Sequence, residues 1–103
     1  MRRLRLNTSA KRNLREIAQH LRLQGTSRRS VIAIVESLGA QCEKLAGLPG
    51  ELGRPRSELA PGMRSFPFRG YAIFFLYSDD ELIVIHILST RQDYSAQSWK
   101  EEG

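Results

Sequence analysis

Three apolar runs between Gly62 and Ser89, separated by two short polar breaks, constrain the fold of this chain more than any other stretch. β-Branched and aromatic residues alternate within these runs, which is typical of strands, and breaks this short are typical of hairpins. The stretch holds all four phenylalanines and two of the three tyrosines, and aromatic side chains bury a large apolar area. We therefore predict a three-stranded antiparallel meander over residues 63–89, with the core on one of its faces.

The last predicted strand is apolar on both faces, which is unusual for an antiparallel sheet with one solvated side. Strict alternation places Ile83, Ile85 and Ile87 on one face. The residues predicted on the other face are Leu82, Val84, His86 and Leu88. A helix hairpin can cover one face, so the C-terminal tail or a partner chain must cover the other.

The N-terminal half carries one strand pattern and two helix patterns. Residues 2–6 alternate basic and apolar side chains, which predicts a short strand near a sheet edge. Apolar residues recur every three or four positions over 9–24 and over 27–46, which predicts two helices. Because a short connection at Gly25 joins them, these helices should form an antiparallel hairpin. With the meander, the elements predict an α+β fold in a single domain over residues 1–103.

Two segments lack a regular pattern of apolar residues. Residues 47–61 contain three prolines and three of the eight glycines, so we expect a loop without regular structure. Inward packing of Leu48, Leu52 and Leu59 should hold this loop in place. Residues 90–103 form a polar C-terminal tail.

Composition excludes several classes of protein. A single cysteine, Cys42, allows no internal disulfide and no zinc site built on several thiolates. Its place on a helical apolar stripe predicts a buried, inert thiol. No run approaches the ~18 apolar residues that span a membrane, and the basic start lacks the apolar segment of a secretory signal. We therefore expect a cytoplasmic protein with no membrane contact, and the sequence contains no metal-ligand cluster or cofactor motif.

Positive charge is concentrated in the first third of the chain. Residues 1–30 carry nine Lys/Arg and one acid, Glu16, within a total net charge of +5. A basic segment of this kind favours a polyanion or an acidic partner protein. The alternative is that the arginines form the solvated face of a helix, and charge alone does not choose between these interpretations.

Three motifs in the second half of the chain resemble those of a known superfamily. They are GRPRSEL at 53–59, PGMRSFPFRGYAIFF at 61–75 and HILSTRQDY at 86–94. Together with the order of the elements, they resemble the RelE/ParE toxin superfamily and, within it, the ParE branch. The resemblance covers nearly the whole chain in element order. The chain departs from the ParE-like pattern at Ser89, a position that is often histidine in that branch.

The resemblance implies the toxin of a type II toxin–antitoxin pair, held inactive by a cognate antitoxin. ParE-like members are known for poisoning DNA gyrase, whereas RelE-like members cut mRNA in the ribosomal A site. ParE-like partners are typically ParD-like proteins whose ribbon-helix-helix dimer binds operator DNA, so this chain would meet operator DNA only indirectly. A third interpretation is a degenerate, non-toxic module that only binds an antitoxin.

RNA cleavage requires a base for the 2′-hydroxyl, an acid for the leaving oxygen and cations for the phosphate. The candidates for these roles are Arg64, His86, Arg91 and Tyr94. RelE-like toxins use several lysines and arginines, but no lysine occurs here between Lys44 and Lys100. His86 lies within an apolar strand, where a histidine satisfied inside the fold is the plainer interpretation. We therefore favour a toxin that acts by binding rather than by catalysis.

Two binding surfaces follow from this interpretation. The surface for gyrase or its cleaved DNA complex comprises Arg64, Arg69, Arg91, Tyr94 and Trp99, because arginine and aromatic side chains anchor interfaces. The alternative for Trp99 is that it only covers the second face of the sheet. An acidic, amphipathic antitoxin segment that folds on binding suits a mixed apolar and basic surface. The residues predicted for that surface are Leu14, Arg15, Ile17, Leu21, Arg22, Val84 and Leu88.

Overall fold

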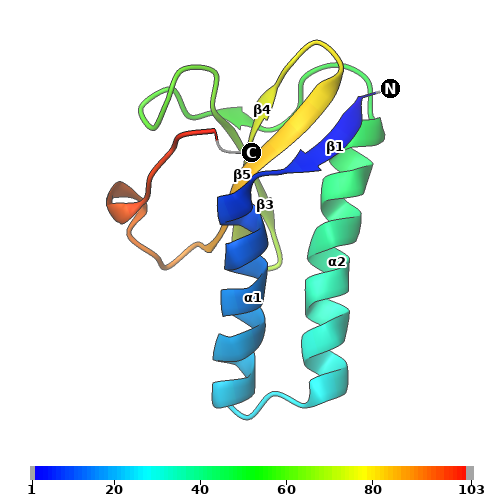
Figure 1. Cartoon of the computed structure of the whole chain (residues 1–103), viewed down its shortest axis with the longest axis vertical. Helices are drawn as coiled ribbons and strands as arrows, with labels where there is room; N and C mark the ends of the chain where they lie inside the picture. The colour runs from blue at the N-terminus through cyan, green and yellow to red at the C-terminus, as the bar shows by residue number, and fades with distance from the viewer. Residues whose placement is uncertain (1, 102–103) are drawn as a thin grey trace.

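The computed structural model describes residues 2–101 and has two helices packed on one side of a mixed sheet (Figure 1). In chain order the elements are β1 (Arg3–Leu6), α1 (Thr8–Leu23), α2 (Arg28–Gly47), β2 (Arg54–Pro55), β3 (Arg64–Phe68), β4 (Tyr71–Tyr77), β5 (Glu81–Ser89) and the 3-10 turn η1 (Tyr94–Ala96). The predicted α+β fold is confirmed, since a strand, a helix hairpin and a meander follow one another. The last part of the predicted tail, residues 102–103, lies outside the described residues.

The strands form one sheet in the order β1-β5-β4-β3-β2, which places β1 at an edge as predicted. β1 runs parallel to β5, and every other neighbouring pair is antiparallel. Parallel neighbours need a long connection, and here the helix hairpin and the first two strands of the meander supply it. β3, β4 and β5 are therefore the predicted meander, and β5 lies in the interior of the sheet.

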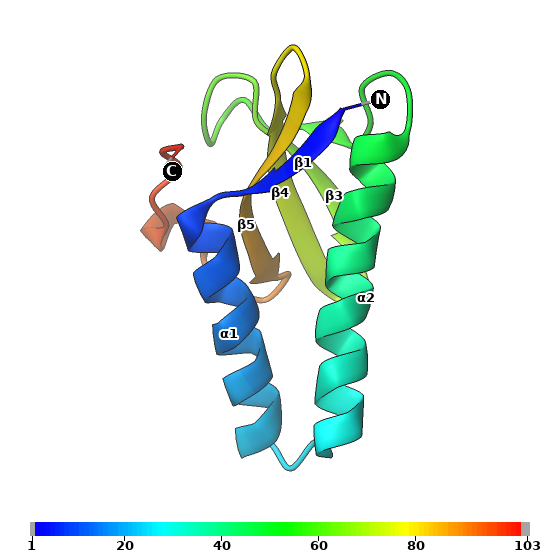
Figure 2. The same ribbon diagram turned by 45° about the vertical axis from the view of Figure 1, so that its right-hand side comes forward.

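The helix hairpin extends beyond the end of the sheet, as both views show (Figures 1 and 2). The Oγ of Ser27 accepts a hydrogen bond from the backbone N–H of Ser30 at 3.2 Å, which caps the start of α2. The hairpin carries several exposed basic side chains, namely Lys11, Arg12, Arg15, Arg22, Arg28 and Arg29. In the described residues, neither helix has the length and apolar character that crossing a bilayer requires.

The larger core cluster lies between the helix hairpin and the sheet. Its most buried members include Leu38, Cys42 and Leu45 from α2 and Phe75 and Val84 from the sheet, each at most 1% exposed. Burial raises the pKa of the Cys42 thiol to about 12, so the thiol stays protonated at neutral pH. The expectation of a buried thiol is confirmed, and a protonated thiol is a poor nucleophile.

The face of the sheet that points away from the helices, called here the second face, carries a smaller apolar cluster. Phe74, Ile85 and Leu88 belong to it, and each is at most 1% exposed. The C-terminal tail crosses this face and packs Tyr94 and Trp99 against the cluster. The tail is thus the cover that the two apolar faces of β5 require.

The predicted division of β5 between the two faces is wrong in the second half of the strand. Phe74 pairs with His86 while Phe75 pairs with Val84, so a β-bulge shifts the alternation at this point. The residues that face the helices are therefore Leu82, Val84 and Ile87, and those on the second face are Ile83, Ile85 and Leu88. Strict period-2 alternation fails because a bulge inserts one residue without a partner opposite.

The expectation of an irregular loop over 47–61 is corrected at β2, a two-residue strand that pairs with the start of β3. Gly53 permits this close approach, because its φ is +77° and a Cβ there would lie 2.7 Å from the Ser65 carbonyl oxygen. Leu52 packs against the larger cluster, and Leu59 packs against the smaller one.

The prediction for Leu48 is wrong, because this side chain is 39% exposed. Leu48 follows the last residue of α2, and its backbone is already extended, with φ −85° and ψ 144°. The side chain has therefore left the apolar stripe of α2 that faces the sheet.

Candidate functional site

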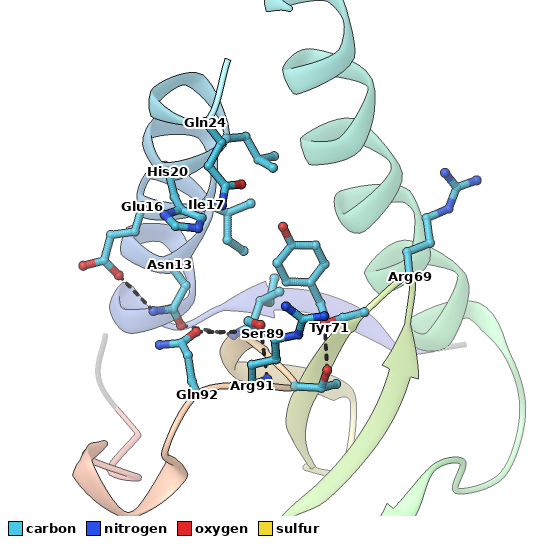
Figure 3. A pocket seen from close by; sticks show the side chains of 14 residues that line it. Asn13, Glu16, Ile17, His20, Gln24, Arg69, Tyr71, Ser89, Arg91 and Gln92 are labelled. Carbon is cyan, nitrogen blue, oxygen red and sulfur yellow. Dashed lines mark hydrogen bonds between the residues drawn. The ribbon is translucent and has the colours of Figure 1, made fainter. Parts of the chain in front are cut away.

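A groove of about 780 Å³ opens between α1, the start of β4 and the end of β5; we call it the α1 groove (Figure 3). α1 contributes Asn13, Glu16, Ile17, His20 and Leu21 to its lining, and Gln24, the residue directly after α1, lines it as well. The meander contributes Arg69, Gly70, Tyr71 and Ile87, and the turn after β5 adds Arg91 and Gln92. The groove thus combines three stretches that are far apart in the sequence.

The β3–β4 turn places Arg69 at the edge of the α1 groove (Figure 3). Arg69 and Gly70 have φ values of 53° and 84°, and two left-handed residues in succession are typical of a type I′ hairpin turn. The twist of this turn matches that of the flanking strands. The Arg69 guanidinium carbon lies 5.5 Å from the centroid of the Phe68 ring.

The turn after β5 is tied to the β3–β4 turn by Thr90, whose N–H and Oγ1 donate to the carbonyl oxygen of Gly70 at 3.0 and 3.2 Å. Within the turn after β5, the N–H of Ser89 donates to Oε1 of Gln92 at 2.9 Å. Arg91 is therefore fixed on the same groove as Arg69. Both side chains are exposed, and among residues 2–101 neither guanidinium pairs with a carboxylate.

The lining of the α1 groove is apolar inside and mostly basic at the edge. Its apolar members are Ile17, Leu21, Tyr71 and Ile87. Burial raises the pKa of the Tyr71 hydroxyl, which therefore stays protonated and can donate a hydrogen bond. Arg69 and Arg91 lie at the edge, with Glu16 as the acidic residue of the lining. Such a groove suits an apolar side chain flanked by carboxylates.

Arg64 does not join Arg69 and Arg91 at the groove. It pairs with Phe75 on β4, whereas the end of β5 pairs with Tyr71, so roughly 13 Å of strand separates the two positions. The Nε of Arg64 donates to the Leu52 carbonyl oxygen at 2.7 Å, and its Nη2 donates to the Gly53 carbonyl oxygen at 3.0 Å. This side chain therefore holds the loop before β3.

Tyr94 and Trp99 lie on the second face and not at the groove. Their rings contact Phe74 edge-on, with centroid separations of 5.0 Å for Tyr94 and 4.9 Å for Trp99. The Nε1 of Trp99 donates to the Tyr94 carbonyl oxygen at 3.3 Å. The predicted target-binding residues are thus divided between the groove, the loop before β3 and the second face.

The four candidates for RNA cleavage do not converge on one site. His86 is 1% exposed, and its two ring nitrogens lie 2.7 Å from Oδ1 of Asn13 and 2.8 Å from the Ser98 carbonyl oxygen. A histidine enclosed in this way cannot reach a 2′-hydroxyl of bound RNA unless the tail moves. Within the described part of the chain, no group of three His, Cys, Asp or Glu side chains could hold a metal ion.

The predicted antitoxin-binding residues fall into accessible and inaccessible sets. Ile17 and Leu21 line the α1 groove, and Leu14 is a partly buried neighbour in the larger cluster. Arg15 and Arg22 are exposed on α1. Val84 is fully buried beneath the helices, and Leu88 is 1% exposed on the second face, so neither reaches the surface.

Sequence reasoning missed two features of the helix hairpin and the groove. Leu23 is 80% exposed and Ile32 is 47% exposed near the tip of the hairpin. Both residues lie off the apolar stripes of their helices, so their exposure could have been predicted from the sequence. Tyr71 and Gln92 line the groove but could not be assigned to it, because their role depends on the packing of α1.

Two solved structures share this fold. A chain of the chromosomal ParDE toxin–antitoxin system from P. aeruginosa matches with a TM-score of 0.76 at 20% identity, over 86% of this chain and 96% of that chain. A chain of the toxin–antitoxin complex RelBE2 from Mycobacterium tuberculosis matches with a TM-score of 0.54 at 20% identity, over 85% of this chain and 96% of that chain. The fold is therefore that of the RelE/ParE class.

Sequence comparison then identifies the family within this class. The family described as ParE toxin of type II toxin–antitoxin system, parDE, matches residues 4–94, so this chain belongs to the ParE toxin family. Toxin ParE3 of Caulobacter vibrioides (strain ATCC 19089 / CIP 103742 / CB 15) is 31% identical over 58 residues, which cover 56% of this chain. The chain spans 57% of the length of that curated relative. The predicted resemblance is confirmed.

Proposed function

We propose that this chain is a toxin that inhibits DNA gyrase by binding to it in the cytoplasm, and that a ParD-like antitoxin neutralises it. The observation that carries the proposal is the match to the ParE toxin family over residues 4–94. The P. aeruginosa structure of the same fold is a ParDE toxin–antitoxin system, which supports an antitoxin partner of the ParD type. Operator DNA would then be contacted by the antitoxin and not by this chain.

The α1 groove is the proposed site for the antitoxin. Its apolar lining would take side chains from one face of an amphipathic segment, and Arg69 and Arg91 would pair with carboxylates beside them. The exposed cations of the helix hairpin, including Arg15 and Arg22, would steer an acidic segment toward it. The basic residues 1–30 would thus interact with an acidic antitoxin.

Arg69 and Arg91 are also the proposed contacts with the target. They are exposed, they lie on one surface, and no carboxylate among residues 2–101 neutralises them. Tyr94 and Trp99 would take part only if the tail left the second face. An antitoxin seated in the groove would cover both arginines, so neutralisation would be direct competition for one surface.

Action by binding fits the side chains better than ribonuclease action does. Arg64 is engaged by two backbone carbonyl oxygens, and His86 is enclosed between α1 and the tail. Among residues 2–101, the possible general bases in the lining of the groove are Glu16 and His20 on the facing helix, and neither is hydrogen-bonded to Arg91. Phosphate contacts without a positioned base and acid favour binding over cleavage.

Induction of the chain in growing bacteria tests the proposal. We expect growth arrest, an SOS response and trapped gyrase–DNA breaks, and we expect co-expression of the antitoxin to abolish all three. The double variant Arg69→Ala, Arg91→Ala should bind the target at least about tenfold more weakly, which corresponds to roughly 1.4 kcal/mol of lost binding free energy. Its induction should therefore no longer arrest growth. Lys44→Ala is the matched control, because Lys44 is exposed near the far end of the hairpin.

The alternative outcomes separate the other two functions. Growth arrest with mRNA cleavage at ribosomal A sites, mapped by primer extension, and no gyrase–DNA breaks would assign the RelE-like activity. Absence of growth arrest at full expression, with retained antitoxin binding, would assign a non-toxic antitoxin-binding module. Either outcome would overturn the gyrase proposal.

A further inference from the structure

His86 connects the helix side of the sheet to the C-terminal tail. It lies on β5 at the bulge, and its side chain is 1% exposed. Its Nδ1 lies 2.7 Å from Oδ1 of Asn13 on α1, and its Nε2 lies 2.8 Å from the carbonyl oxygen of Ser98 in the tail. One imidazole ring therefore bridges two segments that are otherwise on opposite sides of β5.

The orientation of the Asn13 amide is fixed by a second contact. Its Oδ1 also lies 3.1 Å from the backbone N–H of Ile87, which can only donate. Its Nδ2 lies 3.3 Å from Oε1 of Glu16, which suits a donor. Turning the amide over would set Nδ2 against the Ile87 N–H and leave that buried donor unpaired. The atom facing His86 is therefore an oxygen that accepts.

Both ring nitrogens of His86 thus face hydrogen-bond acceptors. A neutral imidazole has one N–H donor and one lone pair, so it satisfies one of these oxygens and repels the other. The doubly protonated ring donates to both oxygens, and hydrogen bonds from a charged donor are the stronger kind. Burial favours the neutral ring, but two donated bonds and a nearby carboxylate oppose that effect.

The elements around the His86 ring carry several charged and titratable groups. From α1, the Glu16 carboxylate is joined to the ring through the Asn13 amide. From the tail, Glu101 is held by Arg5 of β1 at 2.8 Å. The other groups are Tyr94, exposed Lys100 and Arg56, whose guanidinium lies 5.6 Å from the Tyr94 ring. The negative charge of Glu16 favours the charged ring, whereas the positive charges of Lys100 in the tail and Arg56 in the loop before β3 oppose it.

We propose that His86 is a pH-sensitive latch, protonated on both ring nitrogens while the C-terminal tail covers the second face. Loss of one proton sets a lone pair against an oxygen and weakens the attachment of the tail at Ser98. The remaining attachments are the Asn7 Nδ2 contact with the Lys100 carbonyl oxygen at 3.3 Å, the Arg5–Glu101 ion pair, and the packing of Trp99 on Phe74. With only these contacts left, the tail opens more often and uncovers the apolar cluster for a larger part of the time.

The direction of the pH effect follows from which form the docked tail prefers. Because docking favours the protonated ring, its contribution is fully present below the ordinary histidine value of about 6.5. The contribution is lost as pH rises through the higher value at which the docked ring releases its proton. Alkaline conditions should therefore loosen the attachment of the tail, and acidic conditions down to the carboxylate range should strengthen it.

The experiment uses the purified full-length chain, in which Trp99 is the single tryptophan and lies beside His86 at 5.0 Å between ring centroids. Between about pH 5 and 9, where histidine titrates, we expect a one-proton transition. Through it, Trp99 emission moves to longer wavelength and acrylamide quenching rises several-fold, while far-UV circular dichroism is unchanged. His86→Gln should abolish the transition. His20→Gln, the matched change at the second histidine, should retain it.

Nitrogen-15 NMR of the wild-type ring supplies a readout that needs no variant. We expect both ring nitrogens to show protonated shifts at the low end of this pH range, with the loss of one proton coinciding with the Trp99 transition. A neutral ring while Trp99 is still shielded would overturn the proposal. An identical transition in His86→Gln, or no transition in the wild type, would overturn it as well.

Discussion

At Gly53 the loop after α2 approaches the backbone of β3 more closely than a side chain would allow. A Cβ built there meets the Ser65 carbonyl oxygen at 2.7 Å and the Phe75 ring at 3.0 Å. Gly50, three residues earlier, has the same φ of +77° but has nothing within 4 Å of a built Cβ. The two positions therefore separate the cost of backbone conformation from the cost of contact.

We predict that Gly50→Ala lowers the free energy of unfolding by about 1 kcal/mol, the typical cost of a left-handed conformation for a residue with a Cβ. Gly53→Ala should cost more, about 2–4 kcal/mol in all, because β2 must also move away from β3. Urea denaturation followed by circular dichroism measures both values. Equal losses for the two variants would contradict this account of β2.

At the scale of elements, the tail forms a third layer, on the face of the sheet opposite the helices. Tyr94 and Trp99 pack on Phe74, and the tail is further attached through Asn7 and Arg5. Interior strands that are apolar on both faces cannot leave one face in water without a large cost. The tail therefore belongs to the fold and is not an appendage.

We predict that Trp99→Ala lowers the free energy of unfolding by about 2 kcal/mol, less than the cost for a fully buried tryptophan because the ring is half-buried. The variant should also bind more of the dye ANS, since the cluster around Phe74 is uncovered. Leu23→Ala is the control, because Leu23 is 80% exposed and should change stability by no more than about 0.5 kcal/mol. Equal stability of the Trp99 variant and the wild type would show that the tail does not cover the face.

Elements whose signal is local could be predicted from the sequence, and those that depend on distant contacts could not. Alternation and apolar spacing gave β1, both helices and the meander, because each pattern lies within a few neighbouring residues. The bulge at Phe74 and Phe75 leaves the apolar composition of β5 unchanged, so no pattern marked it. β2 exists because Gly53 lets the loop reach β3, which is a contact between separate segments.

For the candidate site too, the residues on a local pattern could be predicted, and those that depend on distant contacts could not. Ile17 and Leu21 were assigned to a binding surface because they lie on one helical stripe. Arg64 and Arg91 were grouped by residue type alone, yet the length of β4 separates them and two carbonyl oxygens engage Arg64. Whether an arginine is available for a partner depends on which other segments of the chain fold against it. The residue type alone does not reveal these contacts.

At the scale of the whole molecule, the proposed binding site for an acidic partner combines the α1 groove with the exposed cations of the helix hairpin. A partner that binds only the folded chain adds a free energy of RT ln(1 + [L]/Kd) to its stability. The exposed cations of the hairpin should make the association strongly dependent on salt. Stability and binding can therefore be measured on the same complex.

We predict that purified antitoxin at 100 times its Kd raises the free energy of unfolding of the chain by about 2.7 kcal/mol. Arg91→Glu should weaken binding by at least about tenfold and flatten its dependence on salt, because a charge at the groove is reversed. Arg54→Glu, exposed on β2 and outside both the hairpin and the groove, is the control and should bind nearly as well as the wild type. Denaturation with and without antitoxin, and calorimetry at two salt concentrations, supply the measurements. Unaltered affinity of Arg91→Glu would place the antitoxin elsewhere.

The parallel pairing of β1 with β5 determines when this molecule can assemble during synthesis. Arg3 donates from its backbone to the carbonyl oxygen of Asp80, and the register continues to Leu6 opposite Val84. β1 therefore has no strand partner until β5 has been made, and a chain that stops before β5 has neither a complete sheet nor a complete α1 groove.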